Sequence, residues 1–195
     1  MKKVLMIFAI VMVSFANAQK GTYLVSGNVN YYSNKNSNGV DYDSSNFSFS
    51  PKLGYQFADN WTLGVQSSIG QNKSNSTYST SKEDNFSIGS FLRYSKSIND
   101  LFSFFTDLNV GFQNQKVIRS YTDFYEFSEF SQKANGFYAS LQPMIHLKIK
   151  NNFGVNFGLG GIGYSSIEDK KTNNTNSTFS VSFGQAYTIG IQKNF

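Results

Sequence analysis

The sequence contains no cysteine, only two prolines and a single histidine. Without cysteine, disulfides, thiolate metal sites and thiol nucleophiles are excluded. Any mechanism that uses a histidine base would have to use His146. The glycines form no phosphate-binding or dinucleotide motif, and no group of residues has metal-ligand spacing. We therefore expect no catalytic residue, no metal and no cofactor.

Strong net charge and long apolar runs are also missing. The formal charge is +5, of which Lys2 and Lys3 contribute two, so the remainder carries about +3 and indicates no nucleic-acid partner. The only marked apolar run, residues 4–13, follows those lysines and precedes Ala16-Asn17-Ala18. This pattern is typical of a secretory signal peptide and is too short for a spanning helix. We expect a signal peptide over residues 1–18 and one domain over residues 19–195.

Aromatic residues and glycines are abundant, with 20 Phe, 12 Tyr and 16 Gly, and they follow a period of two. In residues 178–195, apolar side chains such as Phe179, Val181 and Ile191 alternate with small polar ones such as Ser180 and Ser182. Alternation of this kind predicts a β-strand with one apolar face. A membrane-spanning strand needs about 9–11 residues, so this strand is long enough to cross a bilayer.

Seven further stretches show the same alternation, so we predict eight strands. The other seven cover residues 20–32, 46–57, 61–71, 85–95, 101–113, 136–148 and 153–164. Connections of about a dozen or more residues alternate with turns of about three to five, which is typical of outer-membrane barrels with long extracellular loops and short periplasmic turns. Pro51 and Pro143 fall within strands, where each removes a backbone donor, so we expect a β-bulge at each.

The apolar face should point outward. An eight-stranded barrel has an interior just wide enough for side chains to fill, and the rings of the apolar face are too many and too large for it. The opposite face is rich in Gly, Ser, Asn and Gln, which suit a narrow wet lumen. The predicted fold is therefore all-β, an eight-stranded antiparallel up-and-down transmembrane β-barrel, with both termini periplasmic.

On these features the mature chain resembles the small eight-stranded outer-membrane barrels of the OmpX and OmpA-barrel type, a porin-like family. The last strand resembles the C-terminal recognition strand of such barrels. The resemblance implies contact with outer-membrane lipid and lipopolysaccharide, insertion by the barrel assembly machinery, and a monomer. The residues it marks as a C-terminal assembly signal are Tyr187, Ile189, Ile191 and Phe195.

Four ionisable residues occupy strand positions predicted to face the lumen: Lys52, Arg93, Asp107 and His146. Buried charges must be paired or solvated, so we expect a polar network that fills the lumen. The alternative is a narrow porin-like channel for ions or small solutes. His146 would lie near the periplasmic end, far from the outer-leaflet lipid, which makes a lipid-modifying enzyme the least favoured interpretation.

The connection over residues 114–135 differs from the other loops because it is rich in aromatic residues. These are Tyr121, Phe124, Tyr125, Phe127 and Phe130. Either the loop folds over the barrel mouth on its own rings, which we favour slightly, or the flanking strands extend as a protruding hairpin. In both cases binding specificity would lie in the loops. The sequence thus predicts a structural or surface-interaction protein that acts in envelope integrity or adhesion, with a surface protein or host ligand as its partner.

Overall fold

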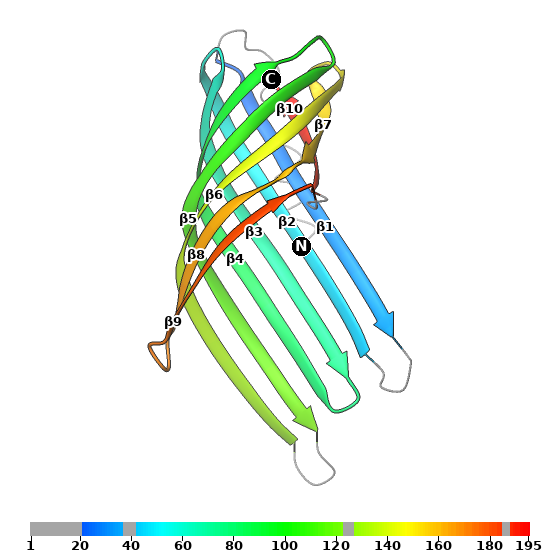
Figure 1. Ribbon diagram of the computed structural model, residues 1–195, viewed down its shortest axis with the longest axis vertical. Helices are drawn as coiled ribbons and strands as arrows, with labels where there is room; N and C mark the ends of the chain where they lie inside the picture. Colours follow the sequence, from blue (N-terminus) through cyan, green and yellow to red (C-terminus); the bar gives the residue numbers. More distant parts are fainter. Residues whose placement is uncertain (1–20, 37–41, 123–126, 185–187) are drawn as a thin grey trace.

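The computed structural model describes residues 21–36, 42–122, 127–184 and 188–195, and these are almost entirely β-strand (Figure 1). No helix among them is long and apolar enough to cross a membrane. The strand segments are β1 (Tyr23–Asn36), β2 (Tyr42–Ala58), β3 (Trp61–Ser76), β4 (Ser79–Ser97), β5 (Phe102–Thr122), β6 (Phe127–Lys150), β7 (Phe153–Gly158), β8 (Gly160–Asp169), β9 (Thr175–Phe183) and β10 (Ile189–Asn194).

These segments form a ring of eight antiparallel strands, since β7 and β8 make up one interrupted strand and β9 and β10 another. From β1 to β6 every strand pairs with the next in sequence. The ring closes where β1 pairs with β10, from Leu24↔Asn194 to Val29↔Ile189. The prediction of an eight-stranded up-and-down barrel is confirmed.

Side chains alternate between the outside of the barrel and its lumen as predicted. The outward face exposes large apolar residues, among them Val181 at 56% and Ile191 at 52%. In the lumen, Asp107 and Asn109 are almost completely buried. At the end of the barrel with the short turns, the rings of Trp61 and Tyr94 pack in a tilted arrangement with their centroids 5.0 Å apart, where an aromatic girdle would lie.

The predicted bulge at Pro143 is present. Three steps along β6 lead from Leu141 to Met144, whereas four steps separate their partners Ile162 and Gly158, so the β7–β8 strand holds one extra residue. Gly160 there has φ +101°, a conformation that favours glycine. The bulge splits the predicted strand 153–164 into β7 and β8. The bulge expected at Pro51 was wrong, because the β2–β3 register is the same on both sides of it.

The connections at the other end differ from the prediction. The loop expected between residues 71 and 85 is a two-residue turn, because β3 continues to Ser76 and β4 begins at Ser79. Cross-strand polar contacts support these extensions, such as Asn46 with Asn72 and the hydroxyls of Ser76 and Ser79 at 2.8 Å. We call this end of the barrel the hairpin end and the opposite one the turn end.

The last predicted strand, 178–195, is interrupted between β9 and β10. Among the described residues, β9 pairs only with β8, and residues 30–35 of β1 pair only with β2. The barrel is therefore closed by β1 and β10 at the turn end, while β9 diverges from β1 toward the hairpin end (Figure 1). We call this opening between β1 and β9 the seam.

Candidate functional site

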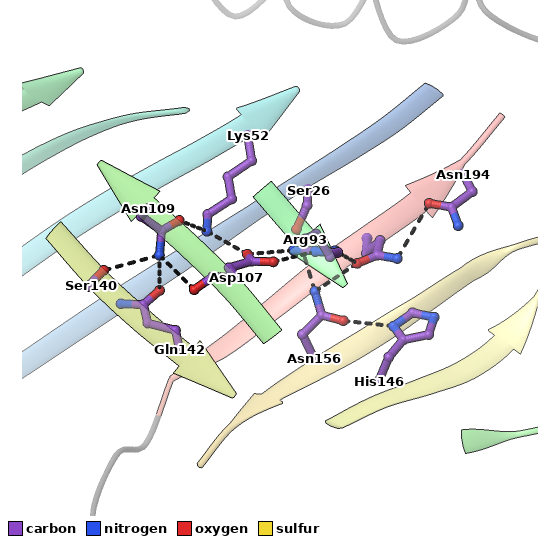
Figure 2. A network of polar contacts seen from close by, with 11 residues as sticks. Ser26, Lys52, Arg93, Asp107, Asn109, Ser140, Gln142, His146, Asn156 and Asn194 are labelled. Carbon is purple, nitrogen blue, oxygen red and sulfur yellow. Dashed lines mark hydrogen bonds and ion pairs between the residues drawn. The ribbon is translucent and has the colours of Figure 1, made fainter. Parts of the chain in front are cut away.

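A network of polar side chains crosses the lumen near the turn end (Figure 2). It is contributed by six strands, because alternate residues of every strand point inward. We call it the lumen cluster; its members are Lys52, Arg93, Asp107, Asn109, His146, Asn156 and Gln192. The four ionisable residues singled out from the sequence all lie in it.

Asp107 is the centre of the lumen cluster and is completely buried. Arg93 donates to both carboxylate oxygens, from Nε at 2.6 Å and from Nη2 at 2.8 Å. Lys52 Nζ donates to Oδ2 at 2.7 Å and to the side-chain oxygen of Asn109 at 3.0 Å. One carboxylate thus faces two cations, which leaves the triad with an excess of one positive charge.

The network continues from Arg93 to the histidine through neutral side chains. Arg93 Nη1 donates to Gln192 at 2.6 Å, and Asn156 Nδ2 donates to the same Gln192 oxygen at 3.4 Å. His146 Nδ1 lies 2.7 Å from Asn156 Oδ1. His146 is hydrogen-bonded to an amide rather than to an acid, so it is not part of a base–acid pair.

Two aromatic rings complete the obstruction. Phe91 and Phe105 are each 1% exposed and point into the lumen, and the Arg93 guanidinium lies over both rings. Two glycines make room for Phe91, since a Cβ built at Gly64 would lie 2.6 Å from its ring and one at Gly54 would lie 2.9 Å from it. Large rings and paired charges therefore fill the lumen at this level.

Between the lumen cluster and the hairpin end the barrel is hollow. A cavity of about 440 Å³ has Lys52 and Asn109 in its lining, with serine hydroxyls and amides around them. It shares Ser48, Ser68 and Ser87 with a second cavity of about 270 Å³, which in turn shares residues with a third at the hairpin end. We call the 440 Å³ cavity the lumen well; it is the deepest part of a polar interior that ends at the lumen cluster.

The aromatic connection is a hairpin, the less favoured of the two predicted arrangements. β5 and β6 extend beyond the other strands and form the longest hairpin of the barrel (Figure 1). Tyr121 and Phe130 are each 49% exposed on it. Phe124 and Tyr125 lie outside the described residues, and Phe127 is described only as the first residue of β6.

Of the predicted C-terminal assembly signal, Tyr187 lies outside the described residues. Ile189 and Ile191 face outward and are more than half exposed. The backbones of Phe195 and Tyr23 exchange hydrogen bonds, at 2.9 Å and 3.1 Å, beside the β1–β10 pairing. These residues thus lie where the ring closes, and their role in assembly stays a prediction.

The sequence pattern did not identify three residues in or beside the lumen cluster: Gln192, Phe91 and Phe105. The signal for the two rings was present, because each breaks the alternation by placing an aromatic residue at an inward position. Gln192 has inward parity but is one of many such amides, and its proximity to Arg93 depends on ring closure. Among the described residues, no group of acidic residues and His146 could hold a metal ion.

The similarity to known proteins extends over almost the whole chain. The family of the outer membrane protein beta-barrel domain matches residues 4–185. Among solved structures, the translocator domain of the autotransporter NalP from Neisseria meningitidis is 12% identical with a TM-score of 0.50, over 100% of this chain and 76% of that one.

Two further structures are similar at lower TM-scores. Ail, the attachment invasion locus protein of Yersinia pestis, is 17% identical with a TM-score of 0.45, over 91% of this chain and 100% of that one. Neisserial surface protein A is 13% identical with a TM-score of 0.44, over 89% and 97%. No curated protein matches the chain. The family match, on a closed ring of strands with an apolar outer face, shows that the chain belongs to the outer membrane β-barrel proteins and spans the bacterial outer membrane.

Proposed function

We propose that the protein is a non-catalytic outer-membrane barrel that acts at the cell surface through its β5–β6 hairpin. The turn end would face the periplasm and the hairpin end the outside, as short periplasmic turns and long outer connections do in this class of barrel. The observation that carries the proposal is the hairpin itself, which extends past its neighbours (Figure 1). Its rings Tyr121 and Phe130 are each about half exposed.

The hairpin also has an unpaired strand edge. On the side of β6 away from β5, strand pairing begins only at Ala134. The carbonyls of Lys133 and Ser131 accept from Lys170 N–H and Lys171 Nζ, so the free part of the edge among the described residues is 127–130. An exposed edge can add a strand from another protein, with backbone hydrogen bonds that tolerate many sequences. This supports adhesion, to a surface protein or a host ligand, as the kind of interaction.

The channel alternative receives less support. Ions would have to pass Phe91, Phe105 and the paired Arg93, all of which are almost fully buried at one level of the lumen. A lipid-modifying activity receives none from His146, whose ring bonds an amide near the turn end.

The test is adhesion of bacteria that express the protein to collagen- and fibronectin-coated surfaces and to one another. We expect the wild type to increase adhesion over an empty vector and the double variant Tyr121→Ser/Phe130→Ser to lose most of the increase. Glu129→Pro should also lose it if strand addition is the mode. In a strand, the N–H and C=O groups of alternate residues face the same side. The Lys133 carbonyl accepts from Lys170 on the side of β6 away from β5. The N–H of Glu129, which has the same parity, therefore faces that side too, and proline removes it.

Glu129→Ala is the matched control, because it removes the same side chain and retains the N–H. Barrel assembly is checked for each variant by the mobility shift of unboiled protein on gels. Adhesion equal to that of the empty vector, or unchanged in all the variants, would contradict the proposal.

A further inference from the structure

The lumen well has the features of a binding site, and these do not depend on the β5–β6 hairpin. Its volume of about 440 Å³ lies in the range of small-molecule pockets, about 300–1,000 Å³. It is enclosed by strands on most sides and ends at the lumen cluster, with Lys52 at its base. We propose that the lumen well binds a phosphate ester that carries hydroxyl groups, with Lys52 as the cation that contacts the phosphate.

The charge of the site selects an anion. Lys52 and Arg93 share the single carboxylate of Asp107, and none of the described residues that line the lumen well is an Asp or a Glu. Every described buried side-chain nitrogen and oxygen has a hydrogen-bond partner, so the hydrogen bonding is satisfied while the extra positive charge is not. A buried charge without a counter-ion is costly, and a bound anion at this position would neutralise it.

The geometry leaves Lys52 able to contact a ligand. Its side chain is 5% exposed, and Nζ donates to Asp107 and Asn109 (Figure 2). An ammonium group has three donors, so one N–H remains for the cavity that Lys52 lines. A fixed cation of this kind is suited to a phosphate as a point charge.

The polar lining of the lumen well is the reason for proposing a ligand with hydroxyl groups. Serine hydroxyls and side-chain amides, including those of Ser48, Ser140 and Gln142, surround the well, and such groups both donate and accept hydrogen bonds. Apart from Asp107, which Lys52 and Arg93 already pair, the acids among the described residues that line the three lumen cavities are Glu83 and Asp169, in the third cavity at the hairpin end. The deepest region is therefore the one that favours an anion.

Two sources could supply this chemistry. A soluble sugar phosphate would enter through the cavities at the hairpin end. A lipid headgroup would enter from the side, because the lumen well is lined by Asn30 of β1 and by Ser180 and Ser182 of β9, the two edges of the seam. The apolar residues Phe179 and Val181, which face outward beside it, would then contact the acyl chains.

The experiment measures binding to the purified barrel in an uncharged maltoside detergent. Glucose 6-phosphate, with glucose as its uncharged partner, is titrated calorimetrically. Phosphatidylglycerol, with phosphatidylcholine as its partner, is counted on the protein by native mass spectrometry. We expect at least one of the two anionic probes to bind, in preference to its partner, and Lys52→Met to weaken that binding at least tenfold. Binding of glucose 6-phosphate alone assigns entry to the hairpin end, and binding of phosphatidylglycerol assigns it to the seam.

Two variants keep the result interpretable. Lys96→Met removes an exposed cation near the turn end and should bind as the wild type does. Ser87→Trp places a large ring in the lumen well, at its border with the second cavity. It should weaken binding by occupying part of the well, and it tests the site even if Lys52→Met fails to fold. The proposal is overturned if neither anionic probe binds, if the uncharged partners bind equally well, or if Ser87→Trp leaves binding unchanged.

Discussion

The guanidinium of Arg93 lies 3.7 Å from the centroid of the Phe105 ring. At this distance the cation contacts the face of the ring, and because both side chains are buried the interaction is desolvated, worth on the order of 2 kcal/mol. The Nε and Nη2 groups at the edge of the same guanidinium donate hydrogen bonds to the Asp107 carboxylate. Arg93 therefore fixes the ring and the carboxylate together, and the lumen is closed at that level by three side chains that hold one another.

Removing the carboxylate should destabilise the barrel strongly. Asp107→Ala leaves Lys52 and Arg93 buried without a counter-charge, which costs about 3–5 kcal/mol in the free energy of unfolding. Urea unfolding in lipid vesicles measures it. The matched control is Asp43→Ala, since Asp43 forms an exposed ion pair with Lys35 at 3.8 Å, worth about 0–1 kcal/mol. Equal losses in the two variants would show that the lumen cluster does not stabilise the fold.

Closure of the lumen predicts low conductance. Wild-type protein in planar bilayers should show no stable single-channel steps, because Phe91 and Phe105 obstruct the path. The double variant Phe91→Ala/Phe105→Ala should show them, and Phe86→Ala/Phe112→Ala serves as its control because these rings face outward. Steps in the wild type would favour the channel alternative instead.

A charge on the outward face should destabilise the barrel more the nearer it lies to the middle of the membrane. Ile88→Arg, in the middle of the barrel wall and 54% exposed, should cost about 2–4 kcal/mol in the free energy of unfolding. Ile98→Arg, beyond the end of β4 at the turn end, should cost about 0–1 kcal/mol. Both residues are exposed isoleucines, Ile88 at mid-wall within β4 and Ile98 in the turn that follows it. If Ile88→Arg left stability unchanged, its side chain would not face lipid.

The β8–β9 turn should depend on pH through Asp169. Its carboxylate accepts from the backbone N–H groups of Thr172 at 2.9 Å and Lys171 at 2.6 Å, and from Gln132. These bonds, that of Thr172 first, lower the pKa of Asp169 below its usual 3.8. The ionised form thus stabilises the turn above about pH 3.8, and the contribution is lost as the pH falls through the lowered pKa.

Amide exchange at Asn173, whose N–H donates to the Asp169 carbonyl at 2.9 Å, reports on this turn. Protection should fall below pH 3.8 in the wild type. In Asp169→Asn it should be low and independent of pH. Wild-type protection that stayed constant down to pH 2 would contradict the assignment.

His146 should be dispensable for the lipids of the membrane. Since the ring of His146 is hydrogen-bonded to the Asn156 amide, His146→Ala removes one buried hydrogen bond and no acid–base pair. We expect the lipid A mass spectrum of expressing cells to be the same for the wild type, the variant and an empty vector. A modification present only with the wild type would assign a catalytic role to His146.

Much of the barrel was predictable because lipid imposes a simple pattern. Where a strand has lipid on one side, residues such as Phe47, Phe49 and Leu53 alternate with small polar ones, and the strand is evident. Beyond the apolar zone both faces are polar, so Asn72 and Lys73 look like a loop although β3 continues through them to Ser76. The hairpin extensions were missed for this reason, since backbone pairing needs no apolar face.

The lumen cluster was predictable in membership and less so in arrangement. Inward parity selected Lys52, Arg93 and Asp107, but parity does not define which strands face each other across the lumen. Arg93 reaches Gln192 only because β10 closes on β1, and that contact joins positions 99 residues apart. Pro51 illustrates the opposite error, since its missing N–H is tolerated without a change of register.

The pairing of β1 with β10 has a kinetic consequence. Every other described pairing joins segments of neighbouring strands around the ring, which can zip together as hairpins with little loss of chain entropy. Leu24 and Asn194, by contrast, must meet across almost the whole chain, and among the described residues β1 and β10 then pair over six positions, with the Tyr23–Phe195 hydrogen bonds beside them. We therefore expect closure to be the last and slowest step of folding, with the sheet an open ribbon until β1 and β10 meet.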